Sequence, residues 1–312
     1  MGLLSNTDSS ILNVKLDSGF EIHVISEKEG INLISILESL SSMKEIYKKL
    51  FMDFHCLSEK KLYYIGNSFE CEIEMDEKGF LINPFPSELV EFNNNLVDNY
   101  LNPMIRLMRL FKEGNICMPL EYYYFIDNST PKLFMSKFSG SYISSEELYA
   151  LENSEIDDLQ KFIQNTKLPF KESFLQLAFE NFELSYQTQN INLSFLSLMI
   201  GLETLFNPGL QELRYRISRN TAVLLGNEKK EDSETVFREI KVLYDKRSKV
   251  VHTGESNIIN KGDLLKLRYY VMESIKKVNK IGKDKEEMLK QLNSQGFFMK
   301  DQKEVKSEEI TK

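Results

Sequence analysis

An arginine and a histidine stand five residues apart in the stretch LYDKRSKVVHTG, which runs from Leu243 to Gly254. These two side chains, Arg247 and His252, suit chemistry on a phosphate group. A guanidinium binds phosphate oxygens in a bidentate manner, and an imidazole can give or accept a proton near neutral pH. The histidine is one of only 3 in the chain. The pair is therefore the first candidate for a reactive site.

The position of Arg247 on its expected helix is unusual for a charged residue. At about 100° per residue, it falls near the centre of an apolar arc. The arc contains Phe237, Ile240, Leu243, Tyr244, Val250 and Val251. A guanidinium on such an arc must have an ion-pair partner or must face a cleft or an interface, because it cannot lose its charge. Glu203 is the candidate partner, since its own helical spacing also directs it inward. Both interpretations stay open at this point.

A single helix does not bring Arg247 and His252 together. Five residues correspond to about 140° of rotation and about 7.5 Å of rise. The two side chains could share a ligand beside a bend, at the mouth of a cleft, or across the two-fold axis of a dimer. Gly254 predicts a left-handed end of the helix, which places His252 in the last turn.

Charge is distributed unevenly along the chain. The net charge of −8 argues against a protein that binds nucleic acid through its overall charge. Residues 211–280 are nevertheless basic, with 16 Lys and Arg against 10 Asp and Glu. A solvated helix face is the commoner cause of such a run, and a binding site for an anionic ligand is the other.

The composition is 42% hydrophobic and 28% charged, which is typical of a globular protein, and no apolar run is long enough to span a membrane. The three cysteines are far apart and odd in number, so we expect no disulfide framework. His23, His55 and Cys56 have no partners at zinc spacing. We therefore expect a reduced, cytoplasmic protein without a metal or another cofactor.

Residues 1–165 carry the pattern of a mixed α+β domain. Apolar residues alternate in ILNVKLDSGFEIHVIS, at 11–26, and predict a β-hairpin around Asp17-Ser18-Gly19. A helical pattern follows over 31–51. The aromatic stretches KLYYIG, FECEIEM and LEYYYFI predict strands.

Residues 166–296 are predicted to form an all-α bundle with short loops. Helical spacing covers Phe170–Gln187, Ile191–Phe206, Gln211–Leu225, Ser233–His252 and Lys261–Ile281. The tail at 297–312 is highly charged, and we expect it to be disordered. The sequence thus predicts an α+β N-terminal domain, a helical bundle and a disordered tail.

Three stretches of this bundle resemble the Apea-like branch of the HEPN superfamily: LETLFN at 202–207, ELRYRISRNTAVLLG at 212–226 and VFREIKVLYDKRSKVVHTG at 236–254. The tract MIRLMRLFKEGNICMP at 104–119 looks like the segment before the bundle in longer members. The resemblance covers about 170–280 and implies a HEPN bundle of four to five helices that commonly dimerises. Many such domains are metal-independent endoribonucleases whose R-x4–6-H motifs meet across the dimer interface.

The resemblance implies roles for the residues of the motif. Arg247 would bind and stabilise the scissile phosphate. His252 would act as general acid and base while the ribose 2′-OH attacks, leaving a 2′,3′-cyclic phosphate. Ser248 stands where active members usually carry a polar residue, often Asn, His or Asp, and it would make a weaker orienting contact.

Other polar residues of the bundle would support this site. Glu203, Arg216 and Arg219 look like the internal polar framework of the bundle, and the two arginines are also candidates for RNA binding. Lys246 and Lys249 lie outside the apolar arc. We expect one of these lysines at most to contact the RNA backbone.

We therefore expect an RNA-cleaving, homodimeric effector, toxin-like or acting in antiviral defence. The defence role rests on analogy with the family. The domain at 1–165 would sense or regulate through a protein or small-molecule trigger. The alternative is a non-catalytic HEPN module that dimerises and binds RNA or a nucleotide. A third hypothesis is an adaptor whose acidic first half docks another protein.

Overall fold

A computed structural model describes residues 1–17, 19–26, 28–29, 32, 61–68, 77, 97–127, 130–138, 147–207, 209, 212–226 and 233–295. The chain divides into two compact units, Met1–Lys167 and Leu168–Lys312. The division lies close to the boundary expected after residue 165. The helix expected at 31–51, apart from Asn32, and the tail at 297–312 lie outside the described residues, as does the FECEIEM strand.

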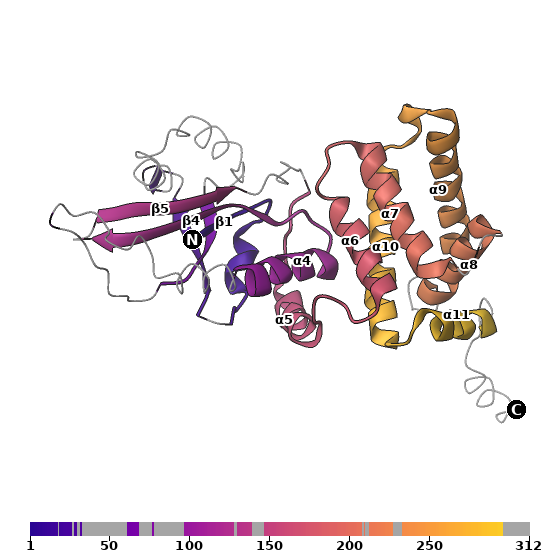
Figure 1. Cartoon of the computed structure of the whole chain (residues 1–312), viewed down its shortest axis with the longest axis horizontal. Coiled ribbons are helices and arrows are strands. Elements are labelled where there is room, and N and C mark those ends of the chain that lie inside the picture. Colours follow the sequence, from indigo (N-terminus) through magenta and orange to yellow (C-terminus); the bar gives the residue numbers. More distant parts are fainter. Residues whose placement is uncertain are drawn as a thin grey trace, which may run out of the picture. The chain divides into compact units, whose positions relative to one another are not determined.

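The first unit contains a five-stranded antiparallel sheet with the strand order β2-β3-β1-β4-β5. Figure 1 labels β1, β4 and β5 of this sheet. Its strands are β1 (Gly2–Ser5), β2 (Glu21–Ser26), β3 (Lys61–Gly66), β4 (Cys117–Asp127) and β5 (Thr130–Phe138). The strands predicted at KLYYIG and LEYYYFI are confirmed as β3 and as most of β4. Alternating aromatic and aliphatic residues give these segments one face to bury.

Helices supply much of the rest of the core of the first unit. They are η1 (Ser9–Asn13), η2 (Val97–Leu101), α4 (Asn102–Phe111), η3 (Asn153–Glu155) and α5 (Ile156–Asn165). Met104 and Met108 of α4 belong to the same buried cluster as Leu4, Tyr63 and Ile65 of the sheet. The first unit is thus α+β, as the sequence predicts.

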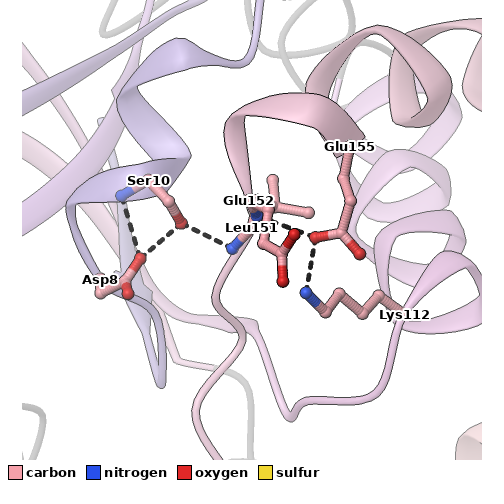
Figure 2. A network of polar contacts seen from close by, with 6 residues as sticks. All are labelled: Asp8, Ser10, Lys112, Leu151, Glu152 and Glu155. Atoms are coloured by element: carbon pink, nitrogen blue, oxygen red, sulfur yellow. Dashed lines mark hydrogen bonds and ion pairs between the residues drawn. The ribbon is translucent and has the colours of Figure 1, made fainter.

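The β-hairpin predicted for residues 11–26 is wrong in its first arm. That arm begins in the 3-10 helix η1, which is capped by Asp8: the carboxylate accepts a hydrogen bond of 2.9 Å from the Ser10 amide. The Ser10 hydroxyl in turn accepts a hydrogen bond of 2.8 Å from the amide of Leu151, far along the chain (Figure 2). Local capping and this distant contact override the alternation of apolar residues. The second arm forms β2, which pairs with β3.

A second polar cluster ties the end of α4 to the start of α5. Glu155 accepts hydrogen bonds from the Lys112 ammonium and, at 2.8 Å, from the Glu152 amide (Figure 2). Glu152 and Glu155 form a capping box around η3, which satisfies amide groups at the helix start. The carboxylate thus fixes the entry of the chain into α5.

The second unit is helical and contains the candidate site (Figure 1). Its helices are α6 (Ser173–Leu184), α7 (Ile191–Phe206), α8 (Leu213–Leu225), α9 (Ser233–Thr253), η4 (Ser256–Ile258), α10 (Lys261–Ile281) and α11 (Lys285–Ser294). The five helices predicted from periodicity are confirmed, with small shifts at their ends. Helices α6, α7 and α10 pack together, and α8 packs against α9. Among the described residues, no helix is long and apolar enough to cross a membrane.

Candidate functional site

Helix α9 carries the candidate reactive residues on a stripe that is buried only in part. Val236, Ile240 and Leu243 are buried at helical spacing, and Arg247 takes the next position of the same stripe. The Arg247 side chain is 24% exposed to solvent. The predicted apolar arc is therefore confirmed around Arg247. It does not continue as a buried surface to the helix end, because Val251 is 49% exposed.

Arg247 contacts Glu203 of helix α7. Its Nε atom lies 3.4 Å from Oε1 of Glu203, so the ion pair that the sequence left open is present. The guanidinium carbon also lies 5.7 Å from the ring centre of Tyr244, one turn earlier in α9. Oε1 of Glu203 is shielded from solvent and accepts no hydrogen bond from the described residues. The contact therefore joins two charges without the parallel hydrogen bonds of a bidentate pair.

Burial sets the electrostatics of this pair. Burial raises the pKa of Glu203 above its usual value of 4.5, and the attraction of Arg247 lowers it again only in part. Burial also raises the pKa of Tyr244, and the Glu203 carboxylate adds to that rise while Arg247 opposes it. Burial thus disfavours the charged form of Glu203 by more than the neighbouring Arg247 favours it.

His252 lies away from this contact. It is exposed in the last turn of α9, while Ser248, next to Arg247, is half-buried. Gly254 follows with a φ of 70°, which confirms the left-handed residue predicted at the helix end. Because α9 is helical through Thr253, about 140° of rotation separates Arg247 from His252. One chain therefore does not direct both side chains at the same atom.

Comparison with protein-family models, curated proteins and solved structures found no match to this chain. The roles expected for Arg247, His252 and Glu203 therefore stay predictions. Within the described part of the chain, no three His, Cys, Asp or Glu side chains gather into a group that could hold a metal ion.

The two lysines that flank Arg247 differ in their surroundings. Lys246 donates a hydrogen bond of 2.6 Å to Oδ2 of Asp263, which belongs to the capping box at the start of α10. Its side chain is 25% exposed and its charge is already paired. Lys249 is exposed on the surface of α9. Of the two lysines, Lys249 is the one free to meet an external anion.

Glu203, Arg216 and Arg219, expected as the internal polar framework of the bundle, have three different surroundings. Glu203 contacts Arg247, the partner that the sequence offered. Arg219 reaches the end of α11, where it donates hydrogen bonds to the carbonyl oxygens of Leu292 at 3.3 Å and Gln295 at 2.7 Å. Arg216 is half-buried, and its Nε atom has no hydrogen-bond partner among the described residues. Arg219 therefore caps a helix, as Lys and Arg often do at C-termini.

A cleft beside Glu203 is a feature that the sequence did not reveal. It has a volume of about 530 Å³ and lies between α6, α7 and the start of α11. Its lining includes Phe174, Leu177, Ile200, Glu203, Asn207 and Lys285. These residues come from three helices, of which α11 is distant in sequence from α6 and α7, so no local pattern brings them all together. Glu203 therefore borders this cleft and also contacts Arg247.

Proposed function

We propose that this chain is a metal-independent endoribonuclease of the HEPN type, in which Arg247 binds the scissile phosphate and His252 transfers protons. The observation that carries the proposal is the contact of 3.4 Å between Arg247, on the apolar stripe of α9, and a carboxylate. The Glu203 carboxylate occupies a place that a phosphate oxygen would take. A phosphate can compete with Glu203 for the Arg247 guanidinium, because phosphate oxygens can form the bidentate hydrogen bonds that Glu203 does not form.

The proposed reaction is an internal transfer within the RNA strand. The ribose 2′-OH attacks the adjacent phosphorus, and the bond from phosphorus to the 5′ oxygen of the next nucleotide breaks. A neutral imidazole accepts the proton of the 2′-OH, and a protonated imidazole gives a proton to the leaving oxygen. Arg247 stabilises the charge that develops on the non-bridging oxygens. The products carry a 2′,3′-cyclic phosphate and a free 5′-OH.

A homodimer would complete this site. The rotation along α9 separates Arg247 from His252 in one chain, and a copy related by a two-fold axis can bring its own histidine to the arginine. Val251, next to His252, supports such a contact because it is apolar and 49% exposed. In a cell, the enzyme would act in the cytoplasm as a toxin-like or antiviral effector, with the unit Met1–Lys167 as its regulatory part.

The ion pair also favours a second candidate function. If Glu203 and Arg247 serve only to hold α7 against α9, the bundle is a non-catalytic module that dimerises and binds RNA or a nucleotide. Such a module needs no exposed imidazole five residues after the arginine. The presence of both side chains is the reason to prefer the enzyme.

A cleavage assay in excess EDTA tests the proposal. The full-length protein, Arg247→Ala, His252→Ala and the control Arg238→Ala are incubated with RNA, and the ends of the products are analysed. Arg238 is exposed on α9, so its loss removes the same charge from the same helix without touching the site. We expect wild type and the control to release 2′,3′-cyclic phosphate ends and the other two variants to be inactive. Cleavage that EDTA abolishes, or that both site variants retain, contradicts the mechanism. RNA binding by an inactive wild type supports the second candidate.

A further inference from the structure

The cleft between α6, α7 and the start of α11 is not used by the proposed cleavage. Its volume of about 530 Å³ falls in the range of sites that bind small molecules or parts of larger ligands. Phe174 and Leu177 of α6 and Ile200 of α7 form an apolar wall. Leu177 and Ile200 remain 49% and 45% exposed. Large apolar side chains that stay exposed in a concave surface are typical of a binding site.

Lys285 is the charged residue of this cleft without an ion-pair partner among the described residues. Glu203, at one end, contacts Arg247. At the other end the cleft borders a groove in which Glu286 and Lys290 pair at 2.8 Å. Lys285 is half-buried, and burial lowers the pKa of its ammonium below the usual 10.5. A partly desolvated cation without a counter-charge favours an anionic ligand.

Hydrogen-bonding groups also line the cleft. They belong to Ser173, Thr204 and Asn207. Asn207 uses its side-chain oxygen to accept a hydrogen bond of 2.8 Å from the Gly209 amide, which leaves its amino group for another partner. The cleft thus offers an apolar wall, polar groups and one cation without an ion-pair partner among the described residues. A ligand that matches all three has a planar body, polar edges and an anionic end.

We propose that this cleft binds the nucleotide of the RNA strand next to the cleaved phosphate, with its base against Phe174 and Leu177 and a phosphate at Lys285. The inference rests on the proposed cleavage at Arg247 and assigns the subsite that holds the strand for it. Every base has an apolar face that can stack on an aromatic ring, and its edge carries donors and acceptors. Glu203 connects the two places, because it lines the cleft and contacts Arg247.

RNA affinity tests this subsite when cleavage is switched off by His252→Ala. A short fluorescent single-stranded RNA is titrated into this full-length variant by anisotropy at several salt concentrations. Lys285→Ala, Phe174→Ala and Leu177→Gln are each added to it. The matched control is Lys283→Ala, because Lys283 is exposed two residues away and donates to the Gln291 side chain. Leu177 is half exposed, so its change does not depend on repacking the core.

We expect Lys285→Ala to lower the slope of log affinity against log salt by about 0.7, the value for one phosphate contact on a single strand. Phe174→Ala should weaken binding at least about five-fold, as the loss of one base stack does. Leu177→Gln should weaken it in the same direction. Lys283→Ala should change neither the affinity nor the slope, and circular dichroism should show the same helix content for all variants.

Equal slopes for Lys285→Ala and Lys283→Ala, or unchanged affinity in Phe174→Ala and Leu177→Gln, overturn the subsite. AMP serves as a second probe: if it binds in a Lys285-dependent manner without competing with RNA, the cleft is a mononucleotide site and the RNA subsite is overturned. If the wild type cleaves RNA but the cleft variants bind RNA as tightly as their parent, the subsite is overturned and the proposed cleavage stands. If the wild type does not cleave RNA but RNA binding depends on Lys285, the proposed cleavage is overturned and the binding site in the cleft is supported.

Discussion

The Nε atom of Arg247 lies 3.4 Å from Oε1 of Glu203, and this contact joins helix α9 to helix α7. Glu203 is 19% exposed and Arg247 is 24% exposed, so solvent reaches both side chains in part. An incoming phosphate would have to replace the carboxylate beside the guanidinium. Glu203 is then a competitor of the substrate, and its charge should lower the affinity for RNA.

Glu203→Gln should therefore increase RNA affinity. The change removes the competing charge and keeps the size of the side chain. A partly exposed ion pair contributes up to about 1 kcal/mol, which corresponds to about a five-fold gain in affinity. Anisotropy with single-stranded RNA in the His252→Ala background measures it. Glu255→Gln is the control, because it removes an exposed negative charge three residues after His252. Weaker binding by Glu203→Gln than by the control would mean that Glu203 positions Arg247 for RNA.

The same substitution should change how stability depends on pH. Burial raises the pKa of Glu203 above 4.5, so the folded protein binds this proton more tightly than the unfolded chain. The contribution of the group to the free energy of unfolding is therefore largest below pH 4.5 and falls as pH rises through the pKa of folded Glu203. Urea unfolding at stepped pH should show wild type losing stability relative to Glu203→Gln over this rise. If wild type instead gains stability relative to Glu203→Gln as pH rises, the pKa of Glu203 is lowered by folding and the account is contradicted.

Lys249→Ala should weaken RNA binding, while Lys246→Ala should not. Lys249 is exposed, whereas Lys246 is bonded to Asp263 at 2.6 Å. The loss of one phosphate contact lowers the salt slope of binding to a single strand by about 0.7. Lys246→Ala should instead lower the free energy of unfolding by about 1 kcal/mol or less, because water can reach the Asp263 carboxylate that it leaves unpaired. Salt-dependent titration and urea unfolding of both variants measure the two effects. The reverse pattern would assign the RNA contact to Lys246.

Arg219→Ala should destabilise the end of α11. The guanidinium donates to the carbonyl oxygens of Leu292 and Gln295, at the place where the chain leaves the helix. We expect a loss of about 1–3 kcal/mol in the free energy of unfolding and faster amide exchange in α11. Arg214→Ala is the control, since Arg214 pairs with Asp245 at the surface and should cost less. Unchanged stability together with a lower salt slope for RNA would make Arg219 an RNA contact.

The periodic parts of the chain could be predicted from sequence because their apolar residues repeat at the spacing of the helix. The repeat in α9 identified Arg247 as an exception, and the repeat in α7 offered Glu203 as its partner. Gly254 could be assigned a left-handed conformation because glycine commonly takes this place after a helix.

Contacts between distant segments explain what the sequence did not reveal. The first arm of the expected hairpin forms η1 because Asp8 caps it and Ser10 bonds to Leu151. The partner of Lys246 is Asp263, on the next helix, and no pattern within α9 indicates it. The cleft likewise needs α6, α7 and α11 in place before Phe174 and Lys285 share one surface.

Mixing two inactive variants tests the central claim most directly. Arg247→Ala and His252→Ala are purified, combined in equal amounts and allowed to exchange subunits, and RNA cleavage is measured with differently tagged copies to verify heterodimers. A heterodimer holds one site with both side chains intact, so free exchange should restore about a quarter of wild-type cleavage. If heterodimers form and the mixture stays inactive while wild type cleaves, Arg247 and His252 do not build one site across two chains.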